Sequence, residues 1–129
     1  MPIEFEVSTV ISASSQEIYD AWLDSEAHGK MTGSPAKVSA AVGAEFNAWD
    51  GYIQGRNLRL EPGKRIVQSW RTVEFEASEA DSQIEVTFEA GEAGTKVTIR
   101  HTSLPPHGGQ YEQGWVDSYF EPMKSYFQD

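Results

Sequence analysis

The amino-terminal residues alternate between apolar and polar side chains with a period of two. Residues 3–11 place Ile3, Phe5, Val7 and Ile11 on the same side of an extended chain. This period is typical of a strand that buries one of its faces. We therefore expect residues 3–11 to form a strand whose apolar side faces the core.

Two short helices are predicted to follow this strand. Residues 14–17, Ser-Ser-Gln-Glu, match a capping box, in which the serine hydroxyl accepts a first-turn N–H and the glutamate reaches back. Ile18 and Trp22 follow at helical spacing, so we expect both to turn inward. A second helix over about residues 25–31 is predicted to end at Gly33.

Turn signals from residue 44 onward predict consecutive antiparallel hairpins. Asp50-Gly51 suits a type I′ turn, which needs positive φ at both central residues, and Pro62-Gly63 suits a type II turn. A third hairpin is expected to have its loop at residues 91–94. The registers that these turns set pair the following residues: Trp49 with Tyr52, Ala48 with Ile53, Phe46 with Gly55, Gly55 with Trp70, Asn57 with Gln68, Glu85 with Arg100, Thr87 with Thr98, and Glu89 with Lys96.

The carboxy-terminal segment is rich in aromatic residues at helical spacing. Trp115, Tyr119, Met123 and Tyr126 recur every three or four positions, which predicts a helix with one apolar stripe. Pro122 has no N–H to donate, so it should kink the helix or divide it at the preceding residue. This helix is the long amphipathic element available to cover the apolar face of the sheet.

Composition and charge narrow the possible functions. The 129 residues carry a net charge of −10 and no cysteine. Thiol catalysis, cysteine-ligated metals and disulfides are therefore excluded, and nucleic acids are poor partners for so acidic a chain. Neither a membrane-spanning run nor a signal-peptide pattern occurs, which predicts a cytoplasmic protein without membrane insertion. The scattered histidines and the lack of a phosphate-binding loop predict no metal and no cofactor.

Several motifs together resemble a known family. Residues 43–46 (GAEF), 50–55 (DGYIQG) and 60–71 (LEPGKRIVQSWR) are followed in order by Gly94-Thr95 and Gly114-Trp115. This series is similar to the family named after the carboxy-terminal domain of the heat-shock-protein-ninety ATPase activator, within the START-like proteins of the SRPBCC superfamily. The resemblance covers nearly the whole chain.

The resemblance implies an α+β helix-grip fold over a single domain, residues 1–129. A curved antiparallel sheet would wrap around a long C-terminal helix, with two short helices after the first strand. It also implies a cavity between sheet and helix, which relatives use for lipids, sterols, polyketides and other hydrophobic molecules. The residues that we expect to line this cavity are Trp22, Phe46, Ile53, Gly55, Asn57, Gln68, Trp70, Phe88, His101, Trp115, Tyr119 and Met123.

Each candidate residue also has a purely structural interpretation. The aromatic side chains either border a ligand or simply fill the core. Gly55, inside a strand, indicates close approach by a ligand or by neighbouring rings. His101 is the candidate acid or base, yet an inward histidine is more often structural. Asn57 and Gln68 either orient a polar ligand group or meet water at the end of the sheet.

Three functions follow from these features. The leading hypothesis is binding of a small hydrophobic or amphipathic molecule without catalysis. An enzyme of cyclase, dehydratase or hydrolase type that uses His101 is the second. The third, a chaperone ATPase cofactor, is disfavoured because 129 residues leave no room for a separate amino-terminal domain. A homodimer is compatible with each of them.

Overall fold

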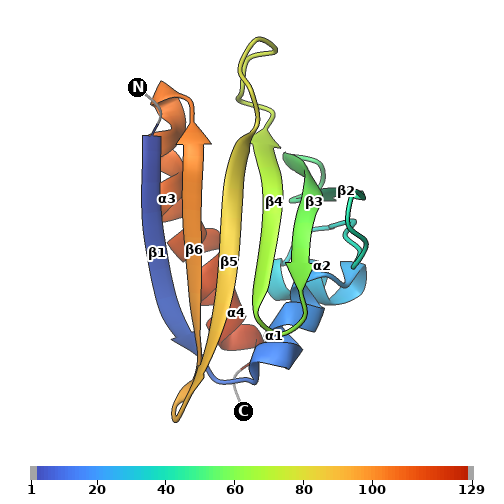
Figure 1. Cartoon of the computed structure of the whole chain (residues 1–129), viewed down its shortest axis with the longest axis vertical. Coiled ribbons are helices and arrows are strands. Elements are labelled where there is room, and N and C mark those ends of the chain that lie inside the picture. The colour runs from blue at the N-terminus through green and yellow to red at the C-terminus, as the bar shows by residue number, and fades with distance from the viewer. Residues whose placement is uncertain (1–2, 128–129) are drawn as a thin grey trace.

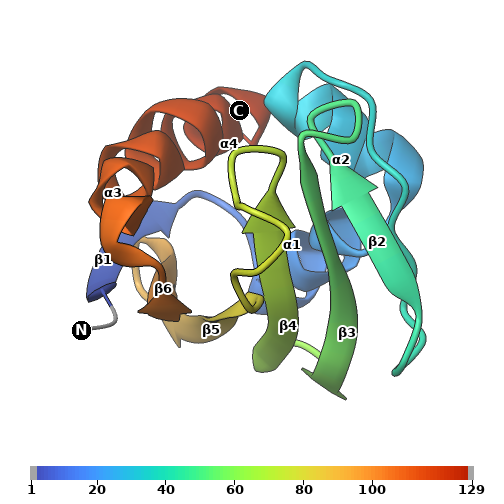
Figure 2. The same ribbon diagram turned by 90° about the horizontal axis from the view of Figure 1, so that it is seen from above.

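The protein consists of an antiparallel sheet with its helices packed on one side (Figures 1 and 2). The computed structural model describes residues 3–127. The six strands lie in the order β1-β6-β5-β4-β3-β2. The elements in chain order are β1 (Ile3–Ile11), α1 (Ser15–Trp22), α2 (Ser25–Thr32), β2 (Glu45–Ala48), β3 (Ile53–Glu61), β4 (Arg65–Thr72), β5 (Ser82–Gly91), β6 (Gly94–Leu104), η1 (Pro106–Gly109), α3 (Gln110–Trp115), η2 (Val116–Phe120) and α4 (Glu121–Tyr126).

The residue pairs predicted from the turns are confirmed. Beside the Pro62-Gly63 turn, however, Glu61 pairs with Arg65 and not with Lys64 as a two-residue loop would require, and a register shift between Asn57 and Arg59 restores the predicted pairing. Gly55 pairs with Phe46 on one side and with Trp70 on the other, and Asn57 pairs with Gln68. The register of β5 with β6 also agrees at every predicted pair. The β2–β3 turn carries the expected positive φ at Asp50 and Gly51, but Trp49 before them also has a positive φ, which the sequence did not predict.

Both amino-terminal helices begin and end as local chemistry dictates. The Glu17 N–H donates to Ser14 Oγ at 3.1 Å, and the Ser14 N–H donates to the Glu17 carboxylate at 3.1 Å, so the predicted capping box is present. Helix α2 has an unpredicted cap, in which Asp24 accepts from the Ala27 N–H. It ends at Gly33, which is left-handed as expected.

The carboxy-terminal helix is one continuous helical run in three parts. It begins at Gln110 in α3, continues through the π-helical η2 and ends in α4. The Glu121 N–H bonds to the Val116 carbonyl, five residues back, directly before Pro122, so the division falls where the proline predicts it. The expected stripe ends early, because Tyr126 lies in the last turn and is 41% exposed.

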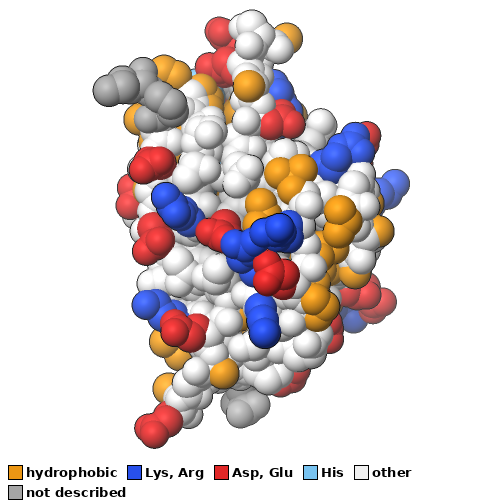
Figure 3. All heavy atoms as spheres, viewed as in Figure 1, with side chains coloured by type: hydrophobic (Ala, Val, Ile, Leu, Met, Phe, Trp, Pro, Cys, Tyr) orange, Lys and Arg blue, Asp and Glu red, His pale blue; other side chains and the backbone are white. Residues whose placement is uncertain are grey.

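The two faces of the sheet differ sharply in polarity. Its outer face carries mixed charges (Figure 3), including Arg65, which pairs with both Glu61 and Glu85. Its concave face curves around the helices (Figure 2) and bears the buried apolar side chains. This is the predicted helix-grip arrangement. No helix within residues 3–127 has the length and apolarity to cross a bilayer.

Candidate functional site

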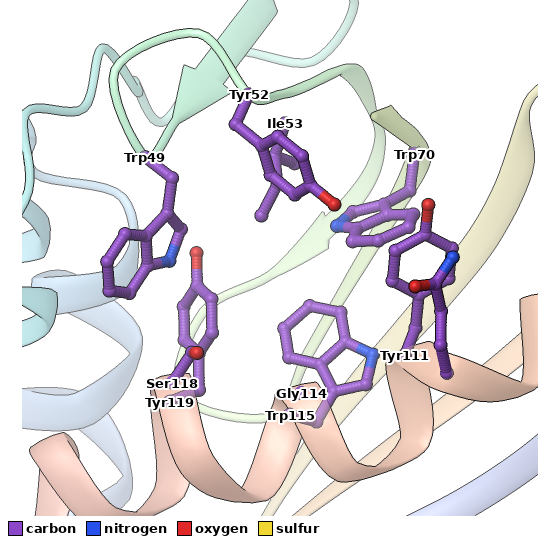
Figure 4. A pocket seen from close by; sticks show the side chains of 10 residues that line it. Trp49, Tyr52, Ile53, Trp70, Tyr111, Gly114, Trp115, Ser118 and Tyr119 are labelled. Atoms are coloured by element: carbon purple, nitrogen blue, oxygen red, sulfur yellow. The ribbon is translucent and has the colours of Figure 1, made fainter. Parts of the chain in front are cut away.

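A cavity of about 350 Å³ lies between the concave face of the sheet and the C-terminal helix (Figure 4). Its volume falls near the lower end of the roughly 300–1,000 Å³ that small-molecule sites occupy. The turn between β2 and β3, the strands β3 and β4, α3 and η2 all contribute to its wall. The lining residues are Trp49, Tyr52, Ile53, Trp70, Gln110, Tyr111, Gly114, Trp115, Ser118 and Tyr119.

The helix side of the cavity is opened by a glycine. Tyr111, Gly114 and Ser118 are spaced three and four residues apart, so they lie on one helix face. A Cβ built at Gly114 would meet no heavy atom within 4 Å. The absence of a side chain at this position therefore leaves space in the wall that a larger residue would fill.

Aromatic rings form most of the rest of the wall. The centroids of Trp70 and Trp115 lie 5.6 Å apart, and Trp70 meets Tyr111 edge-on at 4.9 Å. Trp115 and Tyr119 are also 4.9 Å apart. Such mutual contacts fix the rings in place, so the cavity presents rigid, flat apolar surfaces.

Hydroxyl groups gather at one end of the cavity. The Tyr52 hydroxyl donates to the Glu74 carboxylate, and Tyr111 shares a 2.6 Å hydrogen bond with Thr72 Oγ1. Burial raises the pKa of both tyrosine hydroxyls above the ordinary value, so both stay protonated near neutral pH. Within residues 3–127, no cluster of three or more His, Asp or Glu side chains is arranged to hold a metal ion.

His101 lies behind the cavity wall rather than in it. Its Nδ1 accepts from the Trp115 indole N–H at 3.0 Å, so the ring proton is on Nε2, which donates to Ser82 Oγ at 2.8 Å. Ser82 in turn donates to the Trp70 carbonyl. Burial lowers the pKa of His101 to about 3, so the ring is neutral. Both nitrogens are occupied by the protein, which leaves no free base facing a ligand.

Asn57 and Gln68 also serve the fold rather than the cavity. The Asn57 amide donates to the carbonyls of Ser39 and Ala41, at 2.8 and 3.0 Å, and accepts from Gln68 Nε2 at 2.9 Å. Gln68 accepts in turn from the Trp22 indole N–H. Both side chains are 1% exposed. They neither line the cavity nor meet water, because they anchor the loop over residues 39–44.

This anchor leads to a stability prediction. Asn57→Ala should lower the free energy of unfolding by about 2–3 kcal/mol, because it leaves Gln68 and two loop carbonyls without buried partners. Urea unfolding measures the change. Leu58→Ala is the matched control, since Leu58 is 44% exposed on the same strand and should change stability by at most about 0.5 kcal/mol. Equal effects of the two substitutions would contradict the anchoring role.

The structure brings part of the predicted set together. Of the residues predicted to line a cavity, four do so: Ile53, Trp70, Trp115 and Tyr119. Gly55 lies outside this cavity, where the Phe46 ring covers it. The remaining candidates are buried in the core and do not line the cavity: Trp22, Phe46, Asn57, Gln68, Phe88, His101 and Met123.

Sequence reasoning missed six lining residues. Trp49 and Tyr52 flank the Asp50-Gly51 turn, and the predicted register pairs them only as strand ends. Two aromatic residues beside a tight turn are a signal that could have placed them in the site. Three of the others were missed because the helix begins at Gln110, before the predicted stripe, and Ser118 was missed because it is a polar residue beside the stripe. These four residues are Gln110, Tyr111, Gly114 and Ser118.

Known proteins share this fold and sequence pattern. A protein of Dictyostelium discoideum named "Activator of 90 kDa heat shock protein ATPase homolog" is 30% identical over 116 residues, covering 88% of this chain and 30% of that protein. The crystal structure of an HSP90 activator from Plasmodium falciparum has a TM-score of 0.85 at 22% identity, covering 95% of this chain and 94% of the other. The solution structure of the Aha1 dimer from Colwellia psychrerythraea has a TM-score of 0.81 at 16% identity, covering 98% and 97%.

The sequence also matches a family model over nearly its full length. That family is described as "Activator of Hsp90 ATPase homolog 1-like protein", and the match covers residues 12–128. The chain spans about a third of the length of the curated relatives that it matches. Together with the fold, the match shows that this chain belongs to the Activator of Hsp90 ATPase homolog 1-like family, of the START-like, helix-grip type.

Proposed function

We propose that the protein binds a small hydrophobic molecule in the cavity between β3, β4 and the C-terminal helix. The observation that carries this proposal is the cavity itself, about 350 Å³ in volume and walled mainly by aromatic rings. An apolar molecule that covers these rings removes their apolar surface from water, which favours binding. The START-like fold commonly binds hydrophobic ligands, which supports the same conclusion.

Binding without catalysis fits the chemistry of the wall. The described residues that line the cavity include no His, Lys, Arg, Asp or Glu. Their tyrosine hydroxyls have raised pKa values because of burial, so none of them is a base near neutral pH. His101, the residue on which an enzymatic role depends, has both ring nitrogens engaged within the protein.

The test is to fill the cavity from the helix side. Gly114→Leu should weaken binding of a neutral naphthalene hydrocarbon at least about tenfold, because the new side chain enters the open space at Gly114. The measurement is a titration followed through the indole N–H resonances, since Trp49, Trp70 and Trp115 line the cavity and Trp22 does not.

Gly109→Leu provides the matched control. Gly109 also has no heavy atom within 4 Å of a built Cβ, but it lies outside the cavity wall. This variant should bind the hydrocarbon as the unmodified protein does. Equal affinity in the Gly114→Leu variant, with its spectrum showing a folded protein, would place binding elsewhere and refute the proposal for this cavity.

A second candidate is regulation of a heat-shock ATPase. The names of the Dictyostelium discoideum relative and of the Plasmodium falciparum structure favour it. Adding the purified chain to its cognate heat-shock protein should then raise the steady-state ATPase rate. An unchanged rate at saturating chain concentration would exclude this role for the chain by itself.

A further inference from the structure

The cavity is surrounded by aromatic rings that are inclined to one another. Six rings line it, from the turn before β3, from β4 and from the C-terminal helix: Trp49, Tyr52, Trp70, Tyr111, Trp115 and Tyr119. Figure 4 shows them standing around one space. The planes of Trp70 and Trp115 meet at 41°, and those of Trp115 and Tyr119 at 51°. Rings at such angles form the sides of a cage, which fits a compact, rounded group better than a flat one.

Aromatic rings attract cations through their faces. The π-electrons make each face negative, and a cation within about 6 Å of a ring centroid is attracted to it, most strongly by tryptophan. Three of the six rings in this wall are indoles. The attraction grows when the cation is desolvated, as it is inside a cavity. The wall therefore has the electrostatic character of a cation site although it carries no formal charge.

A carboxylate lies behind one end of this cage. Glu74 accepts a hydrogen bond from the Tyr52 hydroxyl, and this bond polarises the phenol so that its ring becomes richer in electrons. Burial raises the pKa of the Tyr111 hydroxyl, and the charge of Glu74 raises it further. The field of Glu74 therefore reaches the end of the cavity where Tyr52 and Tyr111 lie.

The segments that form most of the wall are acidic. Residues 49–53 contain one Asp, residues 110–120 contain one Glu and one Asp, and neither segment contains Lys or Arg. Arg71 follows Trp70 in β4 but lies on the opposite face of the sheet, where it pairs with Asp81 at 2.8 Å. The whole chain has a net charge of −10. A cation is therefore drawn toward the cavity, whereas an anion would lose its hydration there without gaining a counter-charge.

The same wall restricts the kind of cation. A primary ammonium has three N–H donors, and burying them without acceptors is costly. The hydroxyl end of the cavity is already engaged, since Tyr52 bonds to Glu74 and Tyr111 to Thr72. A quaternary ammonium has no N–H to satisfy and spreads its charge over its carbon groups, so it enters an aromatic cage at a lower cost.

We propose that the ligand is a hydrophobic quaternary ammonium ion, whose charged head lies among the aromatic rings at the Tyr52 end of the cavity. This inference rests on the proposed function, because it names the chemical class that the same cavity selects. The rings and Glu74 together select the charge. Burial of the apolar part of the ligand supplies affinity that any molecule of that shape would gain.

The test compares three probes of equal heavy-atom number and similar shape, each a benzyl group with a tetrahedral head. Benzyltrimethylammonium carries the cation, neopentylbenzene replaces its nitrogen by carbon, and phenylmethanesulfonate carries an anion. At pH 7 the ammonium ion should bind about tenfold more tightly than the hydrocarbon, and the sulfonate should bind most weakly. Titrations followed through the indole N–H resonances give each dissociation constant. A sulfonate that binds as tightly as the ammonium ion would overturn the preference for a cation.

Glu74→Gln tests the contribution of the carboxylate. It should weaken binding of the ammonium ion about threefold and leave the hydrocarbon unchanged, because glutamine keeps an acceptor for Tyr52 but carries no charge. Glu76→Gln is the matched control, since it removes one charge from the same exposed loop without altering the partner of Tyr52. Equal weakening by the two substitutions would refute a specific role of Glu74.

Fluorination tests the contribution of the rings. Replacing every tryptophan by 5-fluorotryptophan should weaken the ammonium ion about threefold and the hydrocarbon little, because fluorine withdraws electrons from the ring faces with little change of shape. The fluorine resonances of Trp49, Trp70 and Trp115 should shift more on binding than that of Trp22, which lies outside the wall. Equal weakening of both probes would show that the rings act only as an apolar surface.

The outcomes separate the two proposals. If neither the ammonium ion nor the hydrocarbon binds, the cavity is not a ligand site and the proposed function fails. If the hydrocarbon binds at least as tightly as the ammonium ion, the proposed function stands and the preference for a cation is refuted. Ammonium binding that survives Gly114→Leu with equal affinity would place the cation on the acidic surface rather than in the cavity, and it would refute this inference as well.

Discussion

Gly55→Ala is expected to destabilise the protein by at least about 3 kcal/mol, near the upper end of what overpacking usually costs. Gly55 lies in β3 between Phe46 of β2 and Trp70 of β4. A Cβ at this position would overlap the backbone carbonyl oxygen of Ser69 and stand 2.6 Å from the Phe46 ring. The ring can move, but the carbonyl belongs to the neighbouring strand of the sheet. Even the smallest side chain therefore forces the strands apart.

Urea unfolding measures this effect, and Gly114→Ala is the matched control substitution. Gly114 lies within α3 with open space where a Cβ would stand, so alanine there should stabilise the protein by about 0.5–1 kcal/mol through helix propensity. If Gly55→Ala unfolds at the same urea concentration as the unmodified protein, the clash with Ser69 is relieved at no cost and the reasoning is wrong.

The same geometry changes how the cavity must be tested. The sequence predicts that a leucine at Gly55 fills the ligand site of a folded protein, because Gly55 shares a strand face with Ile53 and Trp70. The structure shows the Phe46 ring already over Gly55, and a side chain there would disturb the sheet before it reached any ligand. Gly114, on the helix side, is the position that fills the cavity without touching the sheet.

The fold was predictable because local signals determine it almost completely. The capping residues Ser14 and Glu17, the glycine turns and the period-two strands each have one physical solution. Once a two-residue turn is placed at Asp50-Gly51, the β3 partner of each residue in β2 is determined, whereas the register shift between Asn57 and Arg59 has no such signal. The position of a helix start was harder, because η1 and α3 begin without any side-chain cap.

The residues that line the cavity were only partly predictable, because the cavity covers only part of the concave face of the sheet. A register assigns residues to the concave face, but it does not say which part of that face is filled by other side chains. Asn57 and Gln68 are on this face, yet Asn57 bonds to the loop carbonyls of Ser39 and Ala41, and Gln68 bonds to Asn57 and Trp22. Trp49 enters the site through a left-handed backbone that no propensity favours for tryptophan.

Acidification from about pH 7 to pH 5 is expected to destabilise the protein through two buried histidines. His101 is 0% exposed, and burial lowers its pKa to about 3. His28 is 2% exposed, and burial lowers its pKa too, against a smaller opposing effect of its bond to the Trp22 carbonyl. In the unfolded chain both rings should titrate near the ordinary value of about 6.5.

The sign follows from where the protons bind. Below about pH 6.5 the unfolded chain takes up a proton at each histidine, whereas folded His101 stays neutral until about pH 3. The contribution to stability is therefore complete above about pH 6.5 and is lost as the pH falls. His101 therefore changes the free energy of unfolding by up to about 1.4 kcal/mol per pH unit, or about 2 kcal/mol between pH 7 and pH 5, and His28 contributes in the same direction.

Urea unfolding at pH 7, 6 and 5 measures this dependence. A lost packing contact lowers the free energy of unfolding equally at every pH, whereas a lost titrating group changes its slope with pH. His101→Gln should be less stable than the unmodified protein at every pH, because the Trp115 N–H loses its acceptor. Its slope should nevertheless be shallower by about one proton, since glutamine does not titrate. His107→Gln is the control, because that ring is partly exposed and bonds to Glu79 at the surface. A His101→Gln slope equal to that of the unmodified protein would show that folded His101 takes up its proton over the same pH range as the unfolded chain, and the bond from the Trp115 N–H to its Nδ1 would then be lost on protonation.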